Sequence, residues 1–119
     1  MRRAIIAGLA AGALLAPGHT VAAGYVSGAE LLRKCAGAPG YDQSVCLGYV
    51  AGVADLMDDG RPVARQRACV PDEVVVGQLR NAVRAWLSER QDRLETPASG
   101  LVAQALAETY PCPPAARPR

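Results

Sequence analysis

The chain has 119 residues and carries 13 Lys and Arg against 11 Asp and Glu, a formal net charge of +2. Arg2 and Arg3 precede an apolar N-terminal stretch, and without them the balance is 11 against 11, which excludes nucleic-acid binding through a net cationic surface. The one histidine, His19, lies in the same region. The rest of the chain therefore lacks the usual general base near pH 7 and the commonest metal ligand, so we expect neither an enzyme nor a cofactor.

The first 23 residues have the order of a secretory signal peptide. Two arginines come first, an apolar stretch of 13 residues follows from Ala4 to Ala16, and Val21 and Ala23 supply the small residues that a signal peptidase reads. We expect cleavage after Ala23, which leaves one domain of 96 residues, 24–119 (119 − 23 = 96). A transmembrane helix needs about 20 apolar residues, so an uncleaved anchor is the weaker alternative and no membrane insertion is expected after cleavage.

The first predicted helix follows a capping-box pattern. Ser27 can accept a hydrogen bond from the helix start while Glu30 reaches back. The pattern predicts a helix over 29–35 that ends at Gly37, and a turn rich in Gly and Pro over 37–41.

The second predicted helix begins with Asp42 as its cap and stops at Gly60 and Pro62. Its apolar residues recur at steps of one, three and four, which is helical spacing. These apolar positions are Val45, Cys46, Tyr49, Val50, Val53, Leu56 and Met57. Gly48, Gly52 and Asp55 form another strip on the same helix, spaced four and three apart.

Two further helices complete an all-α, four-helix domain. Pro71 is expected at the first position of the third helix, which runs to about Glu89 with a buried face of Val75, Leu79, Val83, Trp86 and Leu87. Thr96 and Pro97 repeat the pattern of a cap and a first position for the fourth helix. Its predicted apolar face contains Leu101, Val102, Ala105 and Leu106. Pro111 ends that helix, and we expect the tail 113–119 to be disordered.

The four cysteines are expected to form two disulfides, because they lie in a small exported domain. Four cysteines allow three pairings. Cys35 and Cys46 flank the turn between the first two helices, and Cys69 and Cys112 flank the last two, so the helix order favours Cys35–Cys46 and Cys69–Cys112. A zinc site would need closely spaced cysteine pairs, and a catalytic thiol would need a partner base. The sequence offers neither.

Three surface features are candidates for partner contacts. The strip of Gly48, Gly52 and Asp55 can admit a second helix closely, either from this chain or from a second copy in a homodimer. Arg61, Arg65 and Arg67 lie in the longest loop, where arginines can bind carboxylates of a partner protein; a solubilising loop is the alternative. The acidic run 55–59 fits either a solvated helix end, a divalent-cation site or a contact for a basic partner.

Several segments, taken in order, resemble the Rap/Tai family of resistance-associated and amidase-immunity proteins of type VI secretion. The most specific are Cys46-x-Gly48-Tyr49-x-x-Gly52-x-x-Asp55, Cys69-x-Pro71 and Pro111-Cys112-Pro113. The resemblance extends from about Ser27 to Pro113. One departure is Arg90-Gln91, where such sequences commonly have a His-Pro turn.

The resemblance implies an all-helical, disulfide-bonded periplasmic protein, often a homodimer, that binds and blocks a peptidoglycan amidase. Without a histidine or a free thiol it would block the amidase sterically, with the 61–67 loop first and the 90–95 loop second as contact segments. The alternative is a periplasmic envelope-stress or chaperone-like helical protein with no toxin partner.

Overall fold

The computed structural model describes residue 12 and residues 24–114. The predicted signal peptide, except for residue 12, lies outside the described residues. The tail from residue 115 lies outside them as well, and residues 113 and 114 have no regular secondary structure. Residues 24–114 contain four α-helices and two short 3-10 helices and no strand longer than a single bridge. The all-α, four-helix prediction is therefore confirmed. No helix in this part of the chain is both long and apolar enough to cross a bilayer.

Helix α1 spans Gly28–Ala36 and begins as the sequence predicts. The Ser27 Oγ accepts a hydrogen bond of 3.1 Å from the backbone N–H of Glu30, and Gly37 follows the last turn. The hydroxyl cap fixes the start of the helix because it satisfies an amide that has no partner within the helix.

Helix α2 spans Tyr41–Leu56, and the prediction of Asp42 as its cap is wrong. Gly40 occupies the cap position with a φ of 133°, which residues with a side chain rarely adopt. Asp42 instead lies in the first turn, where its carboxylate is 3.5 Å from Lys34 Nζ. The glycine thus sets the start of the helix, and the aspartate links α2 to α1. The 3-10 helix η1, Asp58–Gly60, follows the end of α2.

Helix α3 spans Val76–Ser88 and begins five residues later than Pro71, the predicted start. Pro71 accepts a backbone hydrogen bond of 3.0 Å from Val74 and belongs to a turn. The helix start is marked by Gln78, whose Oε1 accepts the Val75 N–H at 3.0 Å. Cys69, two residues before this turn, is bonded to Cys112 beyond the end of the fourth helix.

The 3-10 helix η2, Gln91–Arg93, leads to helix α4, Ala98–Thr109. The prediction of Thr96 as the cap is wrong, since its hydroxyl donates to the Arg93 carbonyl at 2.7 Å and Pro97 takes the cap position. Pro111 lies two residues beyond the last helical residue, so the predicted stop is confirmed.

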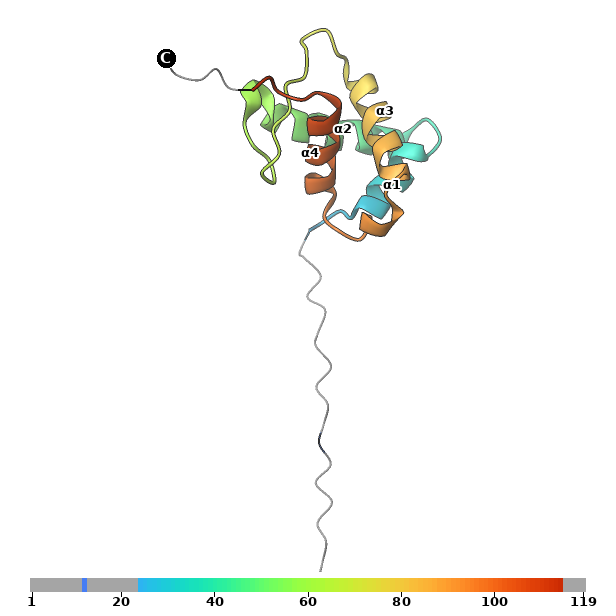
Figure 1. Cartoon of the computed structure of the whole chain (residues 1–119). Coiled ribbons are helices and arrows are strands. Elements are labelled where there is room, and N and C mark those ends of the chain that lie inside the picture. The colour runs from blue at the N-terminus through green and yellow to red at the C-terminus, as the bar shows by residue number, and fades with distance from the viewer. Residues whose placement is uncertain (1–11, 13–23, 115–119) are drawn as a thin grey trace, which may run out of the picture.

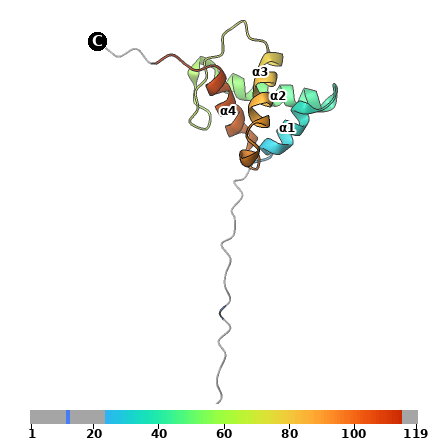
Figure 2. The ribbon, with the colours of Figure 1, turned by 45° about the vertical axis from the view of Figure 1, so that its right-hand side comes forward.

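The four α-helices enclose one apolar core, and each contacts the other three. Helices α3 and α4 run side by side in opposite directions, and α2 crosses behind them (Figures 1 and 2). The largest fully buried side chains are Leu31, Met57, Leu87, Leu106, Val50, Val83, Val102, Cys35 and Cys46. Val75, which was predicted to lie on the buried face of the third helix, is 63 % exposed, and the apolar Leu56 is 60 % exposed.

Both predicted disulfides, Cys35–Cys46 and Cys69–Cys112, are confirmed. Their surroundings differ, because Cys35 and Cys46 are buried in the core whereas Cys69 is exposed. The first disulfide joins α1 to α2 inside the core. The second joins the segment after η1 to the segment after α4.

The segment before α1 is tied to the segment before α4 by backbone hydrogen bonds. Gly28 N–H donates to Thr96 O at 3.0 Å, and Ala98 N–H donates to Val26 O at 2.9 Å. Gly28 lies so close to α4 that an added Cβ would collide with Leu101 Cδ1. Among the helical glycines of the described residues, only Gly28 has a neighbour so close that an added Cβ would collide with it.

Candidate partner-binding surface

The arginine loop forms a short hairpin beside α4. Val63 and Gln66 exchange two backbone hydrogen bonds of 3.0 and 2.8 Å. The two residues at the tip, Ala64 and Arg65, have φ angles of 47° and 64°. Non-glycine residues in this region cost about 1–3 kcal/mol each, and such strain is typical of functional segments. The hairpin therefore holds Arg65 outward at a strained, exposed tip.

The surrounding structure holds the hairpin in place. Cys69 is joined to Cys112, and its backbone N–H also donates to Tyr110 O at 2.9 Å. At the other end of the hairpin, the Cβ of Ala64 would lie 3.6 Å from a Cβ added at Gly100, so the tip rests against α4. The hairpin lies on the side of α4 opposite α3 (Figure 1). A segment held at both ends loses little conformational entropy on binding.

The three predicted contact arginines do not form one group. Arg61 folds back onto the end of α2, where its guanidinium donates to the carbonyls of Asp58 (3.2 Å) and Asp55 (3.3 Å). A cation is favourable at that end of a helix. The guanidinium of Arg67 would be 3.4 Å from a Cβ at Gly60, beside Cys69. Arg65 alone lies at the tip, where it is exposed and has no side-chain hydrogen bond or ion pair with residues 24–114.

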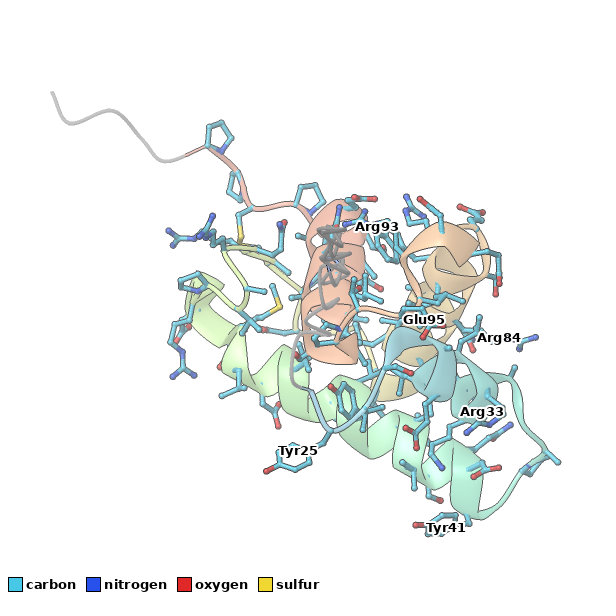
Figure 3. All side chains as sticks on the ribbon, turned by 90° about the horizontal axis from the view of Figure 1, so that it is seen from below. Tyr25, Arg33, Tyr41, Arg84, Arg93 and Glu95 are labelled. Atoms are coloured by element: carbon cyan, nitrogen blue, oxygen red, sulfur yellow. A yellow bond between two sulfur atoms is a disulfide. The ribbon has the colours of Figure 1, made fainter. Side chains whose placement is uncertain are left out.

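The 90–95 loop, the second predicted contact segment, is tied to α3 and α4. The Arg90 guanidinium stacks on the Trp86 ring at 3.9 Å from its centroid and lies 3.1 Å from the Glu108 carboxylate. Trp86 Nε1 donates to the same carboxylate at 2.7 Å. Arg93, which is labelled in Figure 3, donates to Gln104 Oε1 at 2.7 Å. Its arginines therefore have partners within the chain.

Trp86 and Glu108 form a polar link that the sequence reasoning missed. Their separation of 22 residues gives no local signal, and only the antiparallel packing of α3 and α4 brings them together. The Trp86 hydrogen bond is the main cause that lowers the pKa of Glu108 below the ordinary 4.5. Desolvation, the second-largest effect, raises the pKa, while the Gln104 hydrogen bond and the charges of Arg90 and Arg93 lower it further.

We expect the fluorescence of Trp86, the one tryptophan, to report the protonation of Glu108. Because the folded-state pKa is lowered, the contact stabilises the fold above about pH 4.5 and is lost as the pH falls through the lower folded value. A titration of the emission maximum from pH 7 to pH 3 should show a transition below pH 4.5. Glu108→Gln should remove that transition, and an identical titration curve for the variant would contradict the assignment.

The strip of Gly48, Gly52 and Asp55 faces outward. A Cβ added at either glycine would meet no atom of residues 24–114 within 4 Å, the backbone of α2 itself apart. The expectation that the strip packs against another helix of the same chain is therefore wrong, and the homodimer stays a prediction. The reason is that α2 buries the opposite face, with Cys46 and Val50 in the core.

The acidic run after α2 does not form a metal centre. Within residues 24–114, no group of three or more His, Cys, Asp or Glu side chains is placed to hold an ion. The carboxylates of Asp55, Asp58 and Asp59 are exposed around the end of α2 instead.

A comparison with curated proteins finds no match. A comparison with protein families finds that the model of the Rap1a immunity proteins matches residues 27–112. The matched range covers all four α-helices and both disulfides. Immunity proteins are typically non-enzymatic, and their partner is a toxin protein. Because the match covers well over half of the chain, this chain belongs to the Rap1a immunity protein family.

Proposed function

We propose that this protein is exported to the periplasm, where it binds and sterically blocks a peptidoglycan amidase toxin. The proposed export uses residues 1–23 as a signal peptide that is removed after Ala23. Two disulfides support an oxidising compartment, because such bonds persist outside the reducing cytosol. Membership of an immunity protein family supports a toxin as the partner.

The observation that carries the proposal is the hairpin around Arg65. It is exposed, it is clamped by the Cys69–Cys112 disulfide and by α4, and its tip residues are held in a costly backbone conformation. These are the properties of a rigid segment that can enter the cleft of another protein. The arginine at its tip suits the carboxylates of a partner, which it can bind through two parallel hydrogen bonds.

Steric inhibition also agrees with the chemistry that the chain offers. The single histidine lies within residues 1–23, and the two disulfides account for all four cysteines. After signal cleavage, the chain has neither a histidine nor a free thiol with which to modify a hydrolase. Inhibition by occlusion needs only a rigid surface of the right shape.

We expect Arg65→Glu to weaken binding to the target amidase by about ten- to hundredfold, the range of an interface contact residue. The variant should keep its helicity and melting temperature, because Arg65 is exposed. Titration calorimetry with the purified amidase measures the affinity, and circular dichroism measures the fold.

Arg84→Glu is the matched control for this experiment. Arg84 is exposed on α3, on the other side of the molecule from the hairpin (Figure 3), and the variant has the same change in charge. Equal affinity for the two variants would reject the hairpin as the contact. Failure of the wild type to bind any cell-wall hydrolase would reject the amidase and favour the envelope-stress alternative.

We also propose that the protein forms a homodimer through the outer face of α2. Exposed residues at helical spacing run along this face: Tyr41, Gly48, Gly52, Asp55 and Leu56. Tyr41 is 79 % and Leu56 is 60 % exposed, and Tyr41 points away from the body of the molecule (Figure 3). The two glycines between them leave room for a second helix to approach.

Gly52→Leu is expected to shift the protein from dimer to monomer, because its side chain would fill the space that the second α2 needs. The melting temperature of the monomer should not fall, since no atom of residues 24–114 outside the helix's own backbone lies within 4 Å of a Cβ at this position. Sedimentation velocity measures the oligomeric state. A wild-type protein that sediments as a monomer at all concentrations would contradict the dimer.

A further inference from the structure

The two disulfides differ in whether another molecule can reach them. Cys35 is 2 % and Cys46 is 0 % exposed, so their disulfide is enclosed in the core. Cys69 is exposed and Cys112 is half-buried. Both of these residues line a surface hollow of about 590 Å³, here called the disulfide hollow. Hollows of this size admit small molecules, so a small thiol can reach the second disulfide but not the first.

Arg67 places a positive charge beside the exposed cysteine, and it also lines the disulfide hollow. A Cβ added at Gly60 would lie 3.4 Å from Arg67 Nη2 and 3.8 Å from Cys69 Sγ, so these two atoms are at most about 7 Å apart. Gly60 is buried with a φ of 68°, and its missing side chain leaves this space to the guanidinium. Within residues 24–114, Arg67 forms no ion pair, and Asp59 is the one acid that lines the hollow.

This arrangement suits one reaction, the exchange of a disulfide with a thiol. The reaction begins when a thiolate attacks one sulfur atom of the disulfide, and it needs access to that sulfur. A guanidinium nearby attracts the attacking anion and stabilises a cysteine thiolate that is released beside it. Exposed disulfides are also more readily reduced than enclosed ones. Access and charge therefore both favour reaction at the Cys69–Cys112 bond.

We propose that the disulfide hollow is a site of thiol–disulfide exchange, at which a dithiol reduces the Cys69–Cys112 bond. One thiolate of the dithiol bonds to Cys69 Sγ, the bond between Cys69 and Cys112 breaks, and Cys112 leaves as a thiolate that takes up a proton. The second thiol, as its thiolate, then attacks the dithiol sulfur that is bonded to Cys69. Cys69 leaves as a thiolate beside Arg67, and the dithiol ends as a disulfide. Two electrons pass from the dithiol to the protein.

Reduction releases one end of the hairpin that carries Arg65. In the oxidised protein, Cys69 is fixed by the disulfide and by its N–H, which donates to Tyr110 O at 2.9 Å. After reduction that hydrogen bond remains alone, and a segment with fewer ties opens more often. The redox state of this bond thus sets how rigid the hairpin is. The proposal concerns this chain alone and does not depend on a toxin.

Timed alkylation tests the site. The folded protein is incubated with dithiothreitol, quenched with iodoacetamide at intervals and mapped by mass spectrometry. Alkylated Cys69 and Cys112 should appear well before alkylated Cys35 and Cys46, while circular dichroism shows the helices unchanged. In concentrated denaturant the four cysteines should react together. Equal rates for both disulfides in the folded protein, or no reduction of either, would overturn the proposal.

Charge variants separate the exchange site from exposure alone. Arg67→Glu should slow the reduction by about three- to tenfold, because it reverses a unit charge within about 7 Å of the sulfur. Asp59→Asn should speed it, and asparagine tolerates the φ of 57° at this position. Arg84→Glu makes the same charge change on an exposed residue outside the hollow and should have no effect. A wild-type rate for Arg67→Glu would reject the assigned site.

Trypsin measures the release of the hairpin, because it cleaves after arginine. Cleavage after Arg65 should become severalfold faster on reduction, relative to cleavage after Arg84 within α3. The comparison corrects for any general loosening of the fold. An unchanged ratio in the reduced and alkylated protein would show that the bond does not hold the hairpin, and would contradict the proposal.

Discussion

Replacing Cys35 and Cys46 together with alanine is expected to lower the free energy of unfolding by about 2–5 kcal/mol, the range for a native disulfide of a small domain. Both residues are buried, so the change removes core contacts as well as the cross-link. A domain of this size has a stability of only about 5–15 kcal/mol. Denaturant unfolding followed by Trp86 fluorescence and by circular dichroism measures the loss.

The pair Cys69→Ala, Cys112→Ala provides the comparison. The Cys69–Cys112 disulfide spans 43 residues, whereas the Cys35–Cys46 disulfide spans 11. The longer loop increases the entropic stabilisation by the cross-link by about 1 kcal/mol. Cys69 is exposed, however, and its loss leaves the core intact. We therefore expect the larger loss of cooperativity for the Cys35–Cys46 variant and the larger loss of toxin affinity for the Cys69–Cys112 variant. The reverse assignment would contradict these roles.

Gly28→Ala is expected to destabilise the fold by about 1–3 kcal/mol, as overpacking of a filled contact does. The new Cβ would collide with Leu101 Cδ1 and would lie 3.0 Å from Leu94 O. Leu101 is buried, and the Leu94 oxygen belongs to the backbone and accepts a hydrogen bond from Ala29, so neither can move freely. Thermal unfolding measures the change.

Gly77→Ala is the matched control, since it is also a glycine in the first turn of a helix. A Cβ at Gly77 would meet no atom within 4 Å in the part of the chain that the structure describes, α3's own backbone apart, so alanine should stabilise α3 by up to about 1 kcal/mol. Opposite signs for the two variants are the expected result. A neutral Gly28→Ala variant would show that α4 can yield at this contact.

The sequence predicted the number of helices and both disulfides because these depend on local patterns and on chain order. Starts of helices were predicted less well. Pro71 has the features of a first helical residue, but the tie of Cys69 to the end of α4 places it in a turn. The Gln78 cap is a local signal for the correct start that was available in the sequence.

The candidate site was predicted only in part, and for one physical reason. Residue spacing identifies which side chains share a face, but it does not tell which neighbours cover that face. The spacing of Gly48 and Gly52 suggested a close contact within the chain, whereas the contact belongs to Gly28. Similarly, nothing in the sequence distinguished the three loop arginines as partner contacts. In the structure, Arg61 donates to backbone carbonyls at the end of α2, whereas Arg65 lies at the tip of the hairpin.

The hydrogen bonds that join the segments before α1 and α4 also bear on the order of folding. Ala98 and Val26 are 72 residues apart (98 − 26), so their contact closes almost the whole domain. Contacts between distant residues slow folding, because the entropy of closing the loop is lost before the contact can form. A chain that is synthesised from its N-terminus cannot complete this closure until α4 has followed, so partial chains stay open until then.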